Sequence, residues 1–198
     1  MITLNSEETT HSRSFQAKRI SCSYKEKIRA SSKHIFPLLC PIQEYKWIDR
    51  WQCEMVYSVS GVAENNCIFK EDKTGSLLFN SVVSTYWVVS LYDPDNFRIQ
   101  FVLATSGIMI AKINAEINAV DDDTSSVDWM FTITPMNEEA NRVIGTGTEK
   151  KAKLYLTIIG KSLKHYCEKG ELLKLDKASI LKMGLSAGIV ELLKAHVK

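Results

Sequence analysis

Apolar and polar residues alternate over much of the first two thirds of the chain. In the run Arg19–Ile28, Ile20, Cys22 and Tyr24 lie on one side, and serine and lysine residues occupy the other. A period of two is typical of a strand that buries one face, so we expect a strand here.

Residues 31–51 break this alternation. The stretch "SSKHIFPLLCP" places serine, a good N-cap, before apolar residues at helical spacing. Pro37 lacks an amide hydrogen and Pro41 follows closely, so the predicted helix must be short and bent. The next residues, "QEYKWID", predict a second short turn of helix.

The region from Trp51 to about residue 135 predicts a series of antiparallel strands. Turn signals separate them at Asn65–Asn66, at Asp93–Asn96 and in "DDDTSS". The long run at residues 77–92 is apolar on both sides, so the pattern does not fix the face on which Trp87 lies. The alternating runs are "WQCEMVYSVSG", "NNCIFKE", "LLFNSVVSTYWVVSLY", the run from Phe97, "GIMIAKINAEINAV" and "VDWMFTIT".

From about Asn137 the apolar period changes to that of a helix. We expect one long helix near Lys150–Glu168, ended by Gly170, because an apolar stripe faces a row of lysines there. The stripe contains Ala152, Tyr155, Leu156, Ile159, Leu163 and Tyr166.

This order of elements has a geometric consequence. A meander of about six strands twists and curls, and only one long helix is available to cover its concave apolar face. One helix cannot fill a wide curled sheet, so we expect an internal cavity, and such cavities commonly bind small molecules.

Composition narrows the function classes. The chain has 198 residues, 45% hydrophobic and 24% charged, which suits one ordinary globular domain. A net charge of +2 is too small to indicate a nucleic-acid partner. We find no apolar run of about 18 residues that could span a membrane and no apolar signal segment at the N-terminus, so we expect a cytoplasmic protein.

The cysteines and histidines are scattered. Five cysteines, with no CxxC pair, and four separated histidines do not form the close ligand pairs of a structural zinc site. We therefore expect reduced thiols, no metal and no cofactor.

The segment "IFPLLCPIQEYKWIDRWQCEMVYSVSGVAENNCIFK" resembles the START/SRPBCC superfamily, whose helix-grip fold is typified by the major birch pollen allergen. Small bacterial proteins described as SRPBCC or polyketide cyclase/dehydrase-like are similar. The resemblance covers about Arg19 to Glu171. We therefore expect a polar leader at residues 1–16, a helix-grip domain at 17–171 and a helical tail at 172–198.

The resemblance implies an α+β fold. A curved antiparallel sheet of about seven strands would wrap around the long C-terminal helix, and two short helices would follow the first strand. These helices would form a V that closes one end of the sheet. Trp47 and Trp51 would plug the corner, with lining of the ligand entrance as the alternative role.

The resemblance also implies a pocket for a hydrophobic ligand, but it transfers no catalytic residue. The alternation places most of the candidate lining residues on the concave face, under the long helix, and tyrosine hydroxyls could orient a ligand there. The candidates are Tyr24, Trp51, Tyr57, Phe69, Trp87, Phe101, Met109, Ile113, Trp129, Tyr155 and Ile159.

Three acidic residues are open to two interpretations. Glu26 is in phase with the apolar side of its strand, where it could be an acid or base with a raised pKa, or could turn outward or pair with lysine. Glu44 and Glu64 could contact a ligand or could make local contacts, with Glu64 anchoring the Asn65–Asn66 turn.

Three functions fit this sequence. The first is binding, and possible transport, of a hydrophobic or aromatic small molecule. The second is a polyketide cyclase or aromatase-type enzyme that uses the same cavity and one acid–base residue. The third is an interaction module resembling co-chaperones with this fold, which a small cavity and an exposed apolar patch would favour.

The scattered metal-ligand residues predict that folding needs no metal. Dialysis against a strong chelator should leave the melting temperature unchanged, because no bound ion contributes to the free energy of folding. A drop of several degrees would reveal a metal site that the spacing of the cysteines and histidines does not indicate.

Overall fold

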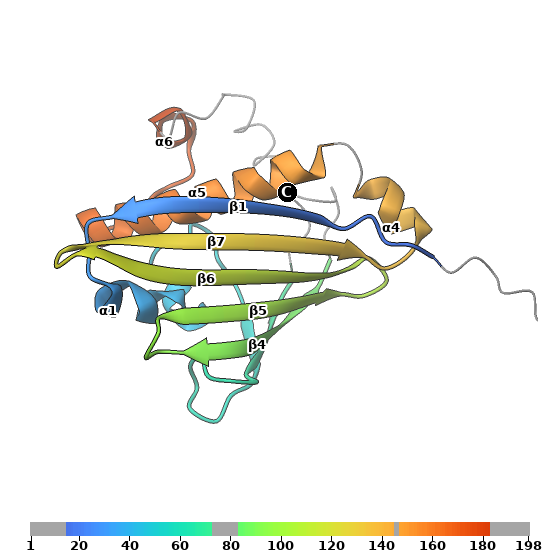
Figure 1. The fold of residues 1–198 in the computed structure, drawn as a ribbon, viewed down its shortest axis with the longest axis horizontal. Helices are drawn as coiled ribbons and strands as arrows, with labels where there is room; N and C mark the ends of the chain where they lie inside the picture. The colour runs from blue at the N-terminus through green and yellow to red at the C-terminus, as the bar shows by residue number, and fades with distance from the viewer. Residues whose placement is uncertain (1–14, 73–82, 145–146, 183–198) are drawn as a thin grey trace, which may run out of the picture.

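A computed structural model describes residues 15–72, 83–144 and 147–182. Its centre is one seven-stranded sheet in which every neighbouring pair is antiparallel (Figure 1). The strand order is β1-β7-β6-β5-β4-β3-β2, so the first strand in the chain closes one edge and the second strand forms the other.

The elements follow one another along the chain in nearly the predicted order. The strands are β1 (Ile20–Ile28), β2 (Glu54–Tyr57), β3 (Ile68–Glu71), β4 (Thr85–Asp93), β5 (Arg98–Thr105), β6 (Met109–Asp121) and β7 (Thr124–Pro135). The helices are α1 (Ser32–Ile35), the 3-10 turn η1 (Phe36–Leu39), α2 (Pro41–Glu44), α4 (Glu138–Val143), α5 (Thr148–Lys169) and α6 (Lys177–Lys182).

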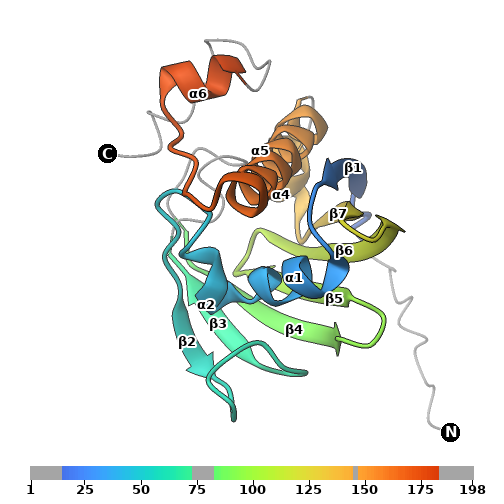
Figure 2. The ribbon, with the colours of Figure 1, turned by 90° about the vertical axis from the view of Figure 1, so that its left-hand side faces the viewer.

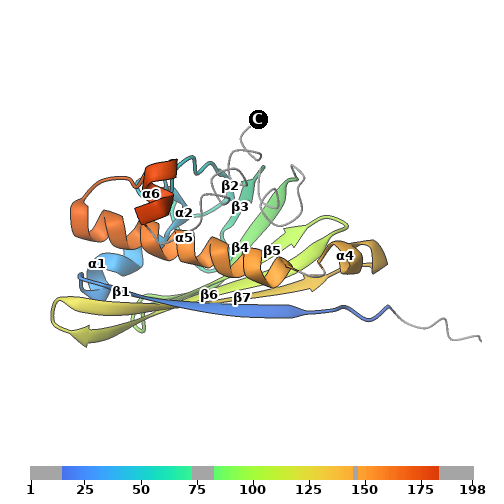
Figure 3. The ribbon, with the colours of Figure 1, turned by 90° about the horizontal axis from the view of Figure 1, so that it is seen from above.

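The sheet curves, and the long helix α5 runs along its concave side over β1 and β7 (Figures 2 and 3). The short helices α1 and α2 lie on the same concave side, below α5 in the view of Figure 2, with α1 against β6. This arrangement confirms the predicted α+β architecture, with a curved antiparallel sheet, a long C-terminal helix and short helices after the first strand.

Two prolines shape the corner between β1 and β2. Pro37 lies in the first turn of η1 and Pro41 begins α2, where a missing amide hydrogen costs nothing. Trp47 and Trp51 fill the corner, and both are buried. Their Nε1 atoms donate to the carbonyl oxygens of Leu38 and Pro41, at 2.8 and 2.9 Å, so each indole is fixed to the turn that it covers.

The inward faces of the strands form one continuous apolar core. The structure settles the face of Trp87, whose side chain is only 4% exposed and stacks on Phe69 with ring centroids 5.3 Å apart. Phe101, Ile113 and Trp129 are buried in the same core, as the alternation predicts.

Tyr57 does not lie on the concave face, so its prediction is wrong. Met55 pairs with Phe69, but Tyr57 pairs with Ile68, so the register shifts by one residue between them. An extra residue in one strand turns the following side chains to the opposite face. Tyr57 is therefore 56% exposed on the outside of the edge strand.

The segment after α5 returns over the corner. The backbone amide of Leu175 donates to the Asp49 carboxylate at 3.1 Å, and Lys174 Nζ lies 3.4 Å from the same group. These contacts tie the chain beyond the long helix to the loop that carries Ile48 and Trp51.

Some predicted segments fall partly outside the described residues. These are most of the leader, the first half of the run at 77–92, of which β4 begins at Thr85, and the last part of the tail, where α6 covers Lys177–Lys182. Within the described part of the chain, no helix combines the length and apolar character needed to cross a bilayer.

Glycine allows α5 to approach the sheet closely. A Cβ atom placed on Gly160 would lie 2.6 Å from Cε1 of Tyr24 and 3.1 Å from Cζ3 of Trp129. At the helix ends, Gly147 and Gly170 adopt positive φ, and the amide of Gly170 donates to the carbonyl oxygen of Tyr166. Gly170 is therefore the C-terminal stop that the sequence predicts.

Substituting Gly160→Ala should destabilise the protein, although alanine is the better helix former. The gain in helix propensity is about 1 kcal/mol, whereas overpacking costs about 1–3 kcal/mol, so we expect a net loss of up to about 2 kcal/mol in urea unfolding. The exposed Lys153→Ala on the same helix is the control and should change little. A more stable Gly160→Ala protein would contradict this packing.

Candidate functional site

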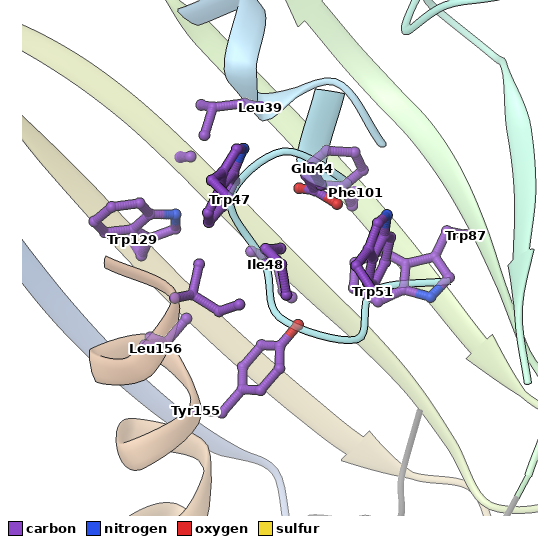
Figure 4. A pocket seen from close by; sticks show the side chains of 13 residues that line it. Leu39, Glu44, Trp47, Ile48, Trp51, Trp87, Phe101, Trp129, Tyr155 and Leu156 are labelled. Carbon is purple, nitrogen blue, oxygen red and sulfur yellow. The ribbon is translucent and has the colours of Figure 1, made fainter. Parts of the chain in front are cut away.

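A narrow, partly open cavity of about 40 Å³ lies between the sheet, the corner segment and α5 (Figure 4). Five parts of the fold contribute to its wall: η1, α2, the loop after α2, the strands β4 to β7, and α5. The lining residues are Leu39, Glu44, Trp47, Ile48, Trp51, Trp87, Phe101, Ile113, Ala115, Trp129, Tyr155, Leu156 and Ile159.

All four tryptophans of the chain line this cavity. Trp47 and Trp51 come from the corner, Trp87 comes from β4 and Trp129 from β7. The first two satisfy their indole N–H groups with backbone carbonyls. The Nε1 atom of Trp87 is buried and has no hydrogen-bond partner in the structure as described, which is an energetically costly state for a donor.

Glu44, at the end of α2, brings a carboxyl group to the apolar wall. Its side chain is half-buried and lines the cavity together with Trp51, Phe101 and Ile48 (Figure 4). No described residue donates a hydrogen bond to its carboxyl oxygens. Burial, and then the negative charge of Glu71, raise the pKa of Glu44 well above its usual value.

Tyr155 is the second oxygen-bearing side chain of the cavity. It comes from α5, and its hydroxyl points toward Ile48 and the corner (Figure 4). Burial raises the pKa of Tyr155 well above its usual value, and the charges of Glu71 and Glu44 raise it further. The hydroxyl therefore remains protonated and can donate a hydrogen bond into the cavity.

A second, open hollow of about 210 Å³ lies beside the cavity. Glu71 lines this hollow, and its charge acts on both Glu44 and Tyr155, so the hollow and the cavity are neighbours. The hollow is lined by Arg50, Gln52, Cys53, Glu54, Lys70, Glu71 and Asp72.

The structure brings seven of the eleven predicted site residues to the cavity. The four others are placed elsewhere. Tyr57 is exposed, Phe69 lies behind Trp87, Met109 is fully buried at the start of β6, and Tyr24 packs against Gly160 and Trp129. The seven that line the cavity are Trp51, Trp87, Phe101, Ile113, Trp129, Tyr155 and Ile159.

Several residues that line the cavity are absent from the predicted set, and most of them lie in the corner segment rather than in the strands. Leu39, Trp47 and Ile48 come from the corner, where no period indicates which side chains point inward. Leu156 follows Tyr155 on the apolar stripe of the helix and could have been included on that basis. Ala115 is in phase with Ile113, so the alternation of β6 also indicates its position.

Glu26 is a buried acid whose pKa shifts in the opposite direction to that of Glu44. Its carboxylate accepts a hydrogen bond from Tyr24 and lies 3.1 Å from Lys164 Nζ and 3.5 Å from Lys161 Nζ, both on α5. Burial acts to raise the pKa of Glu26, but the hydrogen bonds and the lysine charges outweigh it, so the pKa is lowered. Of the two interpretations, the lysine pairing is therefore confirmed.

Glu64 makes local contacts. Its carboxylate accepts hydrogen bonds from the amide of Val59, the amide of Ser60 and the hydroxyl of Ser58. These donors lower the pKa of Glu64. The residue stabilises the loop between β2 and β3, next to Asn66, which adopts the positive φ that the turn requires.

The described part of the chain contains no group of three or more histidine, cysteine, aspartate or glutamate side chains that could hold a metal ion. Its cysteines are all free thiols.

No protein-family model matches the chain, and no curated protein matches it in sequence. Solved structures do match in shape. A START superfamily protein from Mycobacterium smegmatis aligns with a TM-score of 0.54 at 14% identity, over 75% of this chain and 97% of that one. The chain has the helix-grip fold.

Two other helix-grip proteins match equally well. Norcoclaurine synthase from Thalictrum flavum, in complex with dopamine and hydroxybenzaldehyde, aligns with a TM-score of 0.56 at 6% identity, over 78% of this chain and 90% of that one. The Zhui aromatase/cyclase from a Streptomyces species aligns with a TM-score of 0.56 at 9% identity, over 77% and 98%. At these identities the likeness shows the fold.

The unpaired carboxyl group predicts an unusual effect of pH on stability. The pKa of Glu44 is raised in the folded state, so above about pH 4.5 the unfolded chain loses a proton that the folded protein keeps. Wild-type stability should therefore fall as the pH rises from 4.5 toward the pKa of the folded state. Glu44→Gln removes this effect.

In urea unfolding we expect Glu44→Gln to be more stable than the wild type at pH 8, with a smaller difference at pH 5. Glu116→Gln, an exposed change on the outer face of β6, is the matched control and should show no such trend. A Glu44→Gln protein that is less stable at pH 8 would show that the carboxyl group has a partner in the folded protein.

Proposed function

We propose that this protein binds a hydrophobic or aromatic small molecule in the cavity between the sheet and α5. The observation that carries this proposal is the composition of the cavity wall, in which six aromatic side chains line an unfilled space in a domain large enough to fill its own core. Native interiors are close-packed, so an unfilled space between the sheet and the helix is a feature that needs a reason.

The size of the cavity sets a condition on binding. A volume of about 40 Å³ holds roughly three water molecules, whereas pockets for drug-sized ligands measure about 300–1,000 Å³. A larger ligand must therefore displace part of the wall. Ile48, Tyr155 and Ile159 are the half-buried apolar residues of the wall, so their movement costs the least buried contact.

The structural neighbours support an aromatic ligand. Norcoclaurine synthase holds dopamine and hydroxybenzaldehyde, and the Zhui protein is an aromatase/cyclase, so proteins with this fold accommodate aromatic molecules. In this chain the wall offers dispersion contacts from Trp51, Trp87 and Trp129, with Glu44 and Tyr155 to orient a ligand.

An enzyme is the second candidate, and Glu44 favours it. A carboxyl group whose pKa is shifted toward neutrality, next to a tyrosine hydroxyl, has the properties of a general acid or base. In a polyketide cyclase or aromatase-type reaction, Glu44 would move the proton and Tyr155 would hold the reacting oxygen.

An interaction module is the third candidate, favoured by the small cavity and by exposed aliphatic residues near the edge strand. Val56 and Val59 are 51% and 82% exposed, and Tyr57 and Val62 lie beside them in the chain, also exposed. Exposed apolar groups of this kind can mark a protein-binding surface.

The binding proposal can be tested with N-phenyl-1-naphthylamine, a neutral fluorescent apolar probe. We expect a Kd of about 1–10 μM for the wild type. Ala115→Val adds two carbon atoms to a cavity of about 40 Å³ and should weaken binding about tenfold, whereas Ile159→Ala enlarges the cavity and should preserve or strengthen it.

Ala104→Val makes the same addition on the outer face of β5 and is the control. Circular dichroism establishes that each variant is folded. If the probe binds equally to the wild type and to Ala115→Val, it binds outside the cavity, and the exposed surface around Val59 becomes the better candidate.

A further inference from the structure

We infer that the natural ligand is an organic cation, namely a protonated amine with an apolar or aromatic substituent, whose ammonium group lies against Glu44 among the four tryptophans. This inference rests on the proposed function, because it names the chemical class of the ligand in the same cavity.

The first argument is the sign of the charge in the cavity. The lining residues include one carboxyl group and no lysine, arginine or histidine. Among the described residues, the charges coupled to Glu44 are those of Tyr155 from α5, Glu71 from β3 and Cys53 from the loop, and none of these is positive. The nearest basic side chains, Arg50 and Lys70, line the neighbouring hollow rather than the cavity. A carboxylate in this setting lacks a counter-ion, and a cationic ligand would supply one.

Glu26 shows that this absence is specific to the cavity. The same residue type, buried at position 26 between β1 and α5, is paired with Lys161 and Lys164. The fold therefore neutralises one buried carboxylate with its own lysines, but leaves the cavity carboxyl group for a partner from outside.

The second argument is the aromatic wall. The face of an indole ring carries negative potential and attracts cations, and tryptophan does so more strongly than tyrosine or phenylalanine. Trp47, Trp51, Trp87 and Trp129 reach the cavity from three separate elements, so they surround the space from several sides. Aromatic side chains around a carboxylate are a general solution for binding an alkylated ammonium group.

The third argument is that the wall is built for a polar group. The indole N–H of Trp87, buried to 96%, has no partner within the described residues. The half-buried carboxyl group of Glu44 receives no hydrogen bond from any described residue. A pure hydrocarbon would leave both without a partner. An ammonium group donates to the Glu44 carboxylate directly, and an acceptor atom on the ligand's substituent could accept from Trp87.

The volume of the cavity agrees with an ammonium group as the part of the ligand that it holds. A space of about 40 Å³ suits an ammonium head group and is too small for an aromatic ring in addition. The substituent would occupy the room made by Ile48, Tyr155 and Ile159, on the side of the cavity that faces the long helix.

Binding of a cation would be linked to pH with a definite sign. In the empty cavity, burial and then the charge of Glu71 raise the pKa of Glu44, which favours its neutral form. A cation prefers the ionised form, so its binding releases a proton and its affinity rises with pH until Glu44 is ionised in the free protein. A neutral ligand that accepts a hydrogen bond from protonated Glu44 would show the opposite dependence.

Isothermal titration calorimetry with three matched compounds tests this inference. The compounds are 2-phenylethylammonium, neutral 2-phenylethanol and anionic 3-phenylpropionate. The proteins are the wild type, Glu44→Gln and the control Glu116→Gln, which removes an exposed carboxylate on the outer face of the sheet. Titration in two buffers of different ionisation enthalpy measures the proton released.

For the wild type and Glu116→Gln we expect the amine to bind at least tenfold more tightly than the alcohol, with proton release, and the carboxylate to bind least. In Glu44→Gln the amine should bind no more tightly than the alcohol, and its binding should no longer release a proton. The affinity of the wild type for the amine should be higher at pH 8 than at pH 6.

Two results would overturn the inference while the proposed function stands. One is equal binding of amine and alcohol to the wild type, and the other is a preference for the amine that survives in Glu44→Gln. An affinity that falls between pH 6 and pH 8 would likewise favour a neutral acceptor ligand. If neither amine nor alcohol binds and the naphthylamine probe also fails, the proposed function falls with it.

Discussion

The close approach of α5 to the edge formed by β1 and β7 is the constraint on which the rest of the fold depends. Gly160 lets the helix backbone lie against Tyr24 and Trp129, and the lysines of the helix reach Glu26 from that position. A helix held this close to one side of a curved sheet cannot also cover β4 and β3. The corner segment between β1 and β2 has to fill the remaining space, and it does so with two tryptophans fixed by their own hydrogen bonds.

The same constraint explains the two kinds of buried acid. Glu26 lies under α5, where the helix supplies positive charge, and its pKa is lowered. Glu44 lies on the far side of the space, where aromatic and aliphatic side chains surround it and Glu71 adds negative charge, and its pKa is raised. Both residues are glutamates, so their position relative to α5 decides their role. Under the helix a carboxylate forms ion pairs with lysines, and away from it a carboxyl group keeps a raised pKa.

The sequence predicts the fold well because the signals are periodic. Alternation in β5, β6 and β7 places Phe101, Ile113 and Trp129 inward, and the helical stripe places Leu163 in the core. The prediction fails where periodicity is interrupted, as at Tyr57, where one extra residue reverses the strand faces. Glu44 and Ile48 lie in a nonrepetitive turn, so only the folded chain shows that they meet Tyr155 across the cavity. The volume of the cavity depends on how the side chains pack, and no pattern in the sequence encodes it.

The gathering of the tryptophans has a spectroscopic consequence. The chain contains four tryptophans, and all four line one cavity, so no indole elsewhere dilutes the signal. The tryptophan emission of this protein therefore originates entirely at the cavity wall, and its wavelength and quenching report the polarity and contents of that space without any label. A carboxyl group that changes from neutral to charged beside these rings changes their electrostatic surroundings as well, so the protein carries its own optical indicator of the ionisation of Glu44.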